Sequence, residues 1–186
     1  YSCSLHLIMR DRDNSKMKSF TRTGIFFLAW VFCGSLAHAG ALAAGSACDG
    51  ALARFDYPAA VQEAETALMQ GVDDAAGAWI CLARARYEQG NFRSALMALD
   101  RVASLKPGGE LAVRLDNWYG VTLRRLGRGE EAWRHQQAAL SLARQIGDQA
   151  GLATALHNTA GMRYDRGDAF GALRDYQTSI PLNPDL

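Results

Sequence analysis

The chain has 186 residues, a formal net charge of +1 at pH 7 and 49% hydrophobic residues, with only four prolines. A disordered chain is excluded because such chains lack apolar residues, and the alanine-rich composition favours one all-helical domain. From residue 40 onward the chain keeps fifteen basic and seventeen acidic residues. This balance gives no sign of a nucleic-acid-binding protein, which needs a basic excess to attract phosphates.

The first 39 residues are predicted to precede the folded domain. Residues 1–16 are expected to be an upstream extension, because Asp11 and Asp13 suit the start of an export signal poorly. Residues 17–39 have the layout of a secretory signal peptide, with two basic residues, an apolar core and a small-residue cleavage site ending at Ala39. The protein is therefore predicted to be periplasmic or secreted.

Two alternatives for this segment stay open. If His38 is tolerated in the apolar run, the run extends to Gly45 and would serve as an uncleaved N-terminal anchor in the inner membrane. The other alternative is an apolar tract without a role in targeting.

Three markers recur in step along the rest of the chain. A glycine is followed five residues later by an alanine and ten residues after that by a leucine, with spacings of 37 and then 40 residues between copies. A fainter copy contains Ala60, 35 residues before Ala95. Such periods predict stacked helical repeats. The markers are Gly90, Gly127 and Gly167; Ala95, Ala132 and Ala172; and Leu105, Leu142 and Leu182.

Each repeat is predicted to contain two helices. Apolar residues follow helical spacing from Ala75 to Gln89, where Gly90 and Asn91 interrupt them. Glycine tolerates the left-handed conformation that ends a helix, and asparagine can cap the next one. The second helix should end before Pro107. Its predicted apolar face consists of Phe92, Ala95, Leu96, Leu99, Val102 and Leu105.

This helix-pair pattern resembles the tetratricopeptide repeat. The resemblance implies an all-α fold, a right-handed α-solenoid of stacked antiparallel helix pairs, over residues 40–186, with repeats at about 40–74, 75–109, 110–150 and 151–186. In the clearest copy the matching residues are Trp79, Leu82, Ala83, Gly90, Phe92, Ala95, Val102 and Pro107. Later copies contribute Tyr119, Gly120, Gly127, Ala132, Ala139 and Leu140, then Ala160, Gly167, Ala172, Tyr176 and Pro184.

Cys48 and Cys81 fall on the first helices of adjacent repeats. The resemblance places such helices side by side, so the two residues could form a disulfide in an oxidising compartment. The other interpretation is two buried, reduced thiols that act as small apolar side chains.

No catalytic, cofactor-binding or metal-binding motif is found, and no enzymatic activity is expected. The chain has no phosphate-binding loop, no serine elbow and no ligand pair that would join a cysteine to His135 or His157. Two pairs of adjacent carboxylates stand at predicted helix starts, where they complement the helix dipole. These pairs are Asp73 with Asp74 and Glu130 with Glu131.

The resemblance implies that function resides in a concave groove lined by the first helices. Arginines and tyrosines there suit a protein or peptide segment with acidic and apolar residues. The family's lysine-based clamp for a terminal carboxylate is absent, so a chaperone C-terminus is not implied. The predicted groove residues are Ile80, Arg84, Tyr87, Asn117, Val121, Arg124, His157, Gly161 and Tyr164.

These observations predict a non-catalytic interaction scaffold in the cell envelope. The alternative is an N-terminal sensing or regulatory module of a longer protein whose effector lies beyond residue 186. The lack of a polar capping helix after Pro184 favours that longer protein.

Export can be tested directly. Expressed with its leader in a bacterium, the chain should accumulate outside the inner membrane with Gly40 as its first residue, because cleavage is predicted after Ala39. Cell fractionation followed by N-terminal sequencing measures both points. An intact leader on a cytoplasmic protein would contradict this prediction.

Overall fold

The computed structural model describes residues 47–183, all of which belong to the unit His38–Leu186. The predicted extension, signal peptide and first residues of the first repeat lie outside the described residues. Within 47–183 every regular element is a helix, and none of these helices has the length and apolar character needed to cross a membrane.

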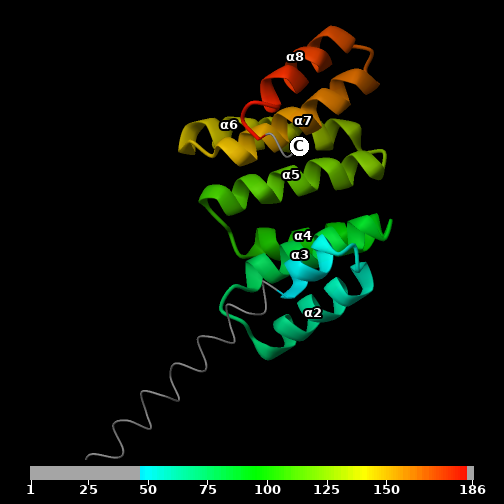
Figure 1. Ribbon diagram of the computed structural model, residues 1–186, viewed down its shortest axis with the longest axis vertical. Coiled ribbons are helices and arrows are strands. Elements are labelled where there is room, and N and C mark those ends of the chain that lie inside the picture. The colour runs from blue at the N-terminus through cyan, green and yellow to red at the C-terminus, as the bar shows by residue number, and fades with distance from the viewer. Residues whose placement is uncertain (1–46, 184–186) are drawn as a thin grey trace, which may run out of the picture. The chain divides into compact units, whose positions relative to one another are not determined.

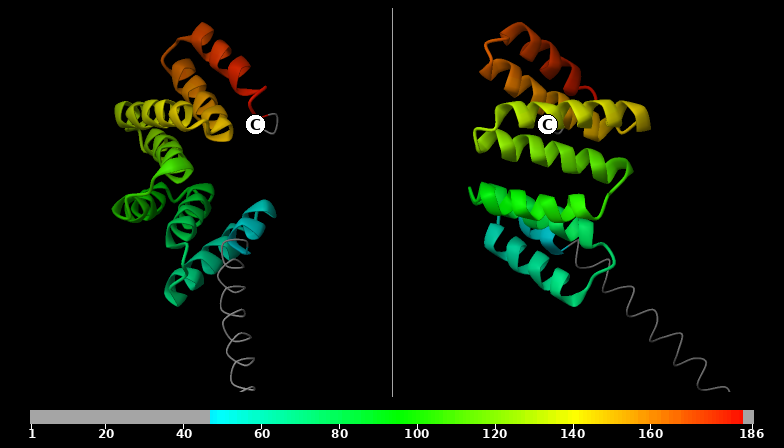
Figure 2. Two further views of the ribbon diagram at one scale, coloured as in Figure 1. Left: turned by 90° about the vertical axis from the view of Figure 1, so that its left-hand side faces the viewer. Right: turned by 180° about the vertical axis from the view of Figure 1, so that it is seen from behind.

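The described residues form an all-α solenoid of helix pairs, which confirms the predicted fold class (Figure 1). Successive helices pack against each other in chain order, and α3 also contacts α5, which in turn contacts α7 (Figures 1 and 2). We call residues 47–53, α3, α5 and α7 the first helices, and the others the second helices. After the helical residues 47–53 come α2 (Tyr57–Gln70), α3 (Ala75–Glu88), α4 (Phe92–Ser104), α5 (Gly109–Arg125), α6 (Gly129–Ile146), α7 (Gln149–Asp165) and α8 (Ala169–Ser179).

The turn within a pair depends on glycine, as predicted. Gly90, Gly127 and Gly167 adopt φ values of 78°, 76° and 84°, in the left-handed region that other residues enter at a cost. Asn91 stands at the N-cap of α4, but its side chain makes no capping hydrogen bond, so that part of the prediction is wrong. The backbone carbonyl of Asn91 instead accepts a hydrogen bond from the amide of Ala95 at 3.0 Å, which is the first hydrogen bond of the helix.

Aspartates cap most of the other helices. Asp74 accepts a hydrogen bond from the amide of Gly77 at 2.8 Å, and Asp148 and Asp168 make the same bond to Gly151 and Gly171. Each cap satisfies a backbone donor that the helix leaves unpaired and places negative charge at the positive end of the helix dipole. The predicted structural role of Asp74 is therefore confirmed.

Small residues lie where the two helices of a pair approach closely. Ala95 and Ala132 have no exposed surface, and Ala172 is 2% exposed. The predicted apolar face of α4 is correct for Leu99 and Val102, which are fully buried. It is wrong for Leu105, which is 52% exposed because α4 ends at Ser104 and the chain turns away.

A polar cluster joins three helices in the middle of the solenoid. The Tyr119 hydroxyl on α5 donates to Asp100 on α4 at 2.7 Å, and the ring stacks on His135 of α6. His135 Nδ1 in turn lies 2.7 Å from Asp116 Oδ1. Burial raises the pKa of Tyr119, and the hydrogen bond to Asp100 raises it further. The phenol therefore remains a protonated donor that holds α5 against α4.

The close approach of the helices gives a stability prediction. Ala95→Leu and Ala132→Leu should each lower the free energy of unfolding by about 1–3 kcal/mol, because a larger side chain overpacks the contact. Urea unfolding followed by circular dichroism measures the change.

Ala103→Leu is the matched control, because Ala103 is an exposed residue of α4. It should leave stability almost unchanged. Equal stability of all three variants and the wild-type protein would show that the helix register is wrong.

Candidate functional site

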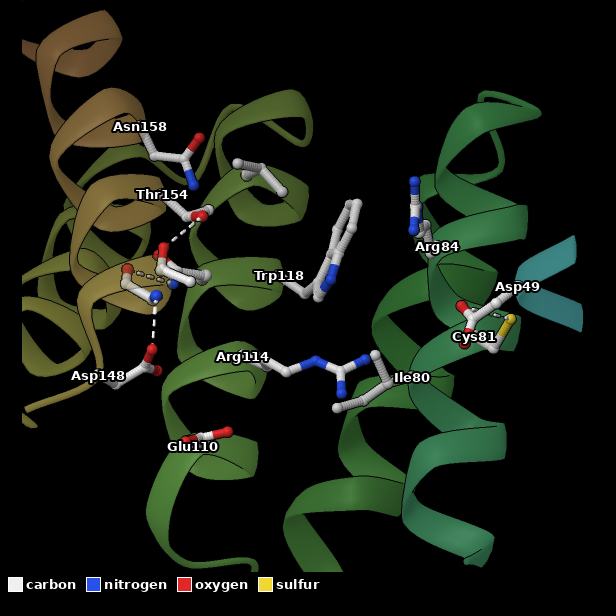
Figure 3. Close-up of a pocket in the computed structure, with 14 residues that line it drawn as sticks. Asp49, Ile80, Cys81, Arg84, Glu110, Arg114, Trp118, Asp148, Thr154 and Asn158 are labelled. Carbon is white, nitrogen blue, oxygen red and sulfur yellow. Dashed lines mark hydrogen bonds between the residues drawn. The ribbon is translucent and has the colours of Figure 1, made fainter. Parts of the chain in front are cut away.

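A cavity of about 380 Å³ lies along the first helices. Every residue that lines it belongs to residues 47–53, α3, α5 or α7, or is Asp148, the N-cap residue of α7; α2, α4, α6 and α8 contribute none. We call this cavity the groove pocket (Figure 3). Its lining consists of Asp49, Ile80, Cys81, Arg84, Glu110, Arg114, Asn117, Trp118, Val121, Asp148, Ala150, Gly151, Thr154 and Asn158.

Two arginines on successive first helices face this pocket. Arg84 comes from α3 and Arg114 from α5, and Figure 3 shows Arg114 extending from α5 toward Ile80 on α3. Both side chains are exposed, and neither forms an ion pair or hydrogen bond within residues 47–183. Their guanidinium groups retain the full set of forked donors that suits a carboxylate.

An aromatic side chain lies between the two arginines. Trp118 projects from α5 into the pocket, with Arg84 opposite it on α3 (Figure 3). The ring is half-buried against the core and meets Tyr87 edge-on, with centroids 5.6 Å apart. Packing against Tyr87 fixes the indole, so the pocket offers a rigid apolar surface as well as positive charge.

Three carboxylates also line the pocket. Asp148 is committed to capping α7 through Gly151, whereas Glu110 has no hydrogen-bond or ion-pair partner among the described residues. Asp49 lies beside Cys81 at the opposite wall (Figure 3). The pocket thus combines positive charge around Trp118 with negative charge along its edges.

The walls of the pocket are tied into the core. Ile80 is only 1% exposed and Asn117 only 5%, so both act as walls rather than as projecting contacts. Asn117 Nδ2 donates to the backbone carbonyl of Gly151 at 3.3 Å, and the backbone carbonyl of Asn117 accepts a hydrogen bond from Gln136 Nε2 at 3.0 Å. These bonds join α5 to α6 and α7 and hold the pocket in one shape.

The structure places the predicted groove residues in two groups. Ile80, Arg84, Asn117 and Val121 line the pocket, whereas the other predicted residues do not. Tyr87 accepts a hydrogen bond from Arg125 Nε at 3.2 Å and supports Trp118 from the side.

Among the others, Arg124 is held in an ion pair with Asp165, with Nε 2.7 Å from Oδ2. Its guanidinium also contacts the carbonyl of Gly161. His157 packs edge-on against Tyr176, and Tyr164 is 68% exposed near the end of α7. These side chains have local partners or lie away from the pocket.

Sequence reasoning missed Arg114 and Trp118. The predicted groove residues extend toward the C-terminal end of each first helix, whereas the pocket lies about one turn nearer the N-terminal end. Arg114 stands three residues before Asn117 and seven before Val121, so it shares their helical face. Extending the same row one turn backward would have found it.

A disulfide joins Cys48 to Cys81, with their Cα atoms 6.4 Å apart. The sequence left open whether these residues pair, and the structure pairs them. The bond links the helical residues 47–53 to α3 and closes a loop with a sequence separation of 33 residues. Since Cys81 also lines the groove pocket, the disulfide fixes the wall that carries Asp49.

Comparison with known families matches residues 111–184 to the tetratricopeptide repeat, which is less than half of the chain. The match supports this repeat for α5 to α8. A comparison with curated proteins found no match. Tetratricopeptide repeats generally mediate protein–protein interactions and are typically non-catalytic scaffolds. Within residues 47–183, no cluster of three or more His, Cys, Asp or Glu side chains could hold a metal ion.

The disulfide should contribute measurably to stability. The double variant Cys48→Ser/Cys81→Ser should lose about 2–4 kcal/mol of unfolding free energy, because the cross-link restricts the unfolded chain. Chemical unfolding with and without reductant measures the loss, and peptide mapping identifies the bond. Reductant should destabilise the wild-type protein but not the double variant. Two free thiols in the oxidised, purified protein would contradict the pairing.

Proposed function

We propose that the protein is a non-catalytic scaffold, exported to the cell envelope, that binds a partner polypeptide in the groove pocket. The proposal also extends the tetratricopeptide repeat from the matched residues 111–184 back over α3 and α4. Gly90 and Ala95 support that extension, because they take the same left-handed turn and buried contact as Gly127 and Ala132. Residues 47–53 with α2 would form the first pair.

The observation that carries the proposal is the composition of the groove pocket. A cavity of about 380 Å³ is within the range of ligand sites, and this one offers two arginines that form no ion pair within residues 47–183, beside a rigid tryptophan. Arginine and tryptophan are enriched among the residues that dominate protein–protein binding energy. A polypeptide partner fits a groove that runs along several first helices.

Export is supported by two features. The leader at residues 17–39 has the layout of a signal peptide. The disulfide between Cys48 and Cys81 is of a kind that persists in oxidising compartments and is rare in the cytosol. Together they favour a periplasmic or secreted protein over one retained inside the cell.

Site-specific photo-crosslinking tests the binding function. A photo-reactive amino acid in place of Val121, which lines the groove pocket, should give discrete polypeptide adducts in cells that express the full chain. Immunoblotting for the protein measures the adducts as bands of higher mass.

The matched control carries the same amino acid in place of Ala138, an exposed residue of α6 that does not line the pocket. It should give no discrete adduct. Adducts from position 138 with none from position 121 would contradict binding in the groove.

A further inference from the structure

We infer that the groove pocket selects a partner segment with one isolated acidic residue next to bulky apolar residues, and disfavours a run of acidic residues. The inference rests on the proposed function, because it names the chemistry of the segment that the groove would bind. It follows from three properties of the pocket: two arginines that form no ion pair in the part of the chain that the structure describes, an apolar surface between them, and carboxylates at the edges of the pocket.

The two arginines are arranged to receive one carboxylate. Elsewhere in the described chain some arginines are paired, namely Arg86 with Glu65, Arg124 with Asp165 and Arg166 with Glu130, whereas others on the second helices, such as Arg93 and Arg144, form no ion pair. Arg84 and Arg114 likewise form no ion pair within residues 47–183, although Glu110 lies one helical turn from Arg114, and both of them line the groove pocket. Instead, Arg114 extends across the pocket toward α3, the helix that carries Arg84 (Figure 3). A carboxylate entering beside Trp118 would find forked donors on both sides.

Apolar side chains must accompany that carboxylate. Trp118 presents its indole between the two arginines, and Val121 follows one turn later on the same face of α5. Burying a Leu-sized or Phe-sized side chain against this surface contributes favourable free energy that a small polar residue would not. The pocket therefore recognises the acidic residue and its apolar neighbour as one unit.

The carboxylates at the edges of the pocket limit how much negative charge the partner segment can carry. Asp49 and Glu110 lie on opposite walls, and Asp148 lies at the start of α7. Carboxylates on either side of the central one in the partner would approach these groups, and contact between like charges is unfavourable. Lysine or arginine at the flanking positions would be favoured instead.

Binding of blocked peptides to the purified full chain tests this inference. The probe Ala-Lys-Leu-Glu-Leu-Lys-Ala carries one carboxylate between leucines and basic flanks. It should bind about tenfold or more tighter than the same peptide with Gln in place of Glu, since a charge-assisted hydrogen bond is lost. It should also bind more tightly than Ala-Glu-Leu-Glu-Leu-Glu-Ala. Fluorescence anisotropy of labelled peptides measures all three.

Variants of the protein assign the selectivity to named residues. The double variant Arg84→Gln/Arg114→Gln should lose the preference for the Glu peptide over the Gln peptide. The control Arg134→Gln, which changes an exposed arginine of α6 outside the pocket, should retain that preference. Glu110→Gln should reduce the difference in affinity between the single-acid and the triple-acid peptide. Circular dichroism and thermal unfolding should show all variants folded, because exposed charges add little to stability.

Equal binding of the Glu and Gln peptides, tighter binding of the triple-acid peptide, or no binding of any peptide would overturn the inference. Polypeptide adducts at position 121 together with any of these results would leave the groove function standing and reject only the selectivity. Absence of adducts at position 121 would reject the groove function itself.

Discussion

The close contact between the two helices of each pair is the constraint on which the rest of the structure depends. Ala95 and Ala132 are fully buried at that contact, and glycines in the left-handed conformation turn the chain sharply enough to form it. Because each second helix packs so closely on its first helix, α3 comes into contact with α5, and α5 with α7. The face that these helices share supplies nearly the whole groove pocket. Small residues at the contacts within each pair therefore position the larger side chains that line the pocket.

The sequence was sufficient for the fold because its markers are local. A glycine followed by an alanine five residues later specifies a turn and a close contact without reference to the rest of the chain. The groove was harder to predict because side-chain partners there are distant in sequence. Arg124 and Asp165 are separated by 41 residues, and only the stacked helices show that this pair withdraws Arg124 from binding. For the same reason, no local pattern marked Arg114 as unpaired or decided between a disulfide and free thiols at Cys48 and Cys81.

The arginines of the groove pocket differ from those that tie the helices to one another. Arginines such as Arg163 and Arg166 pair with carboxylates and cover Trp133, so their charge stabilises the stack of helices. Arg84 and Arg114 form no ion pair or hydrogen bond within the described residues, yet they flank an indole that Tyr87 contacts edge-on. A charged side chain without an internal partner, beside a rigid aromatic, is what a binding surface requires. The disulfide adds a fixed wall to this arrangement.

The central claim is that Arg84, Arg114 and Trp118 act together as one binding surface. Solution NMR of the arginine Nε–Hε and tryptophan indole signals tests it most directly, with the single-acid peptide added stepwise to the full chain. The account predicts that the signals of these three residues shift together at one affinity, while that of Arg124, paired with Asp165, stays in place. Shifts confined to Arg124 or to residues of α6 and α8, with Arg84, Arg114 and Trp118 unmoved, would contradict it.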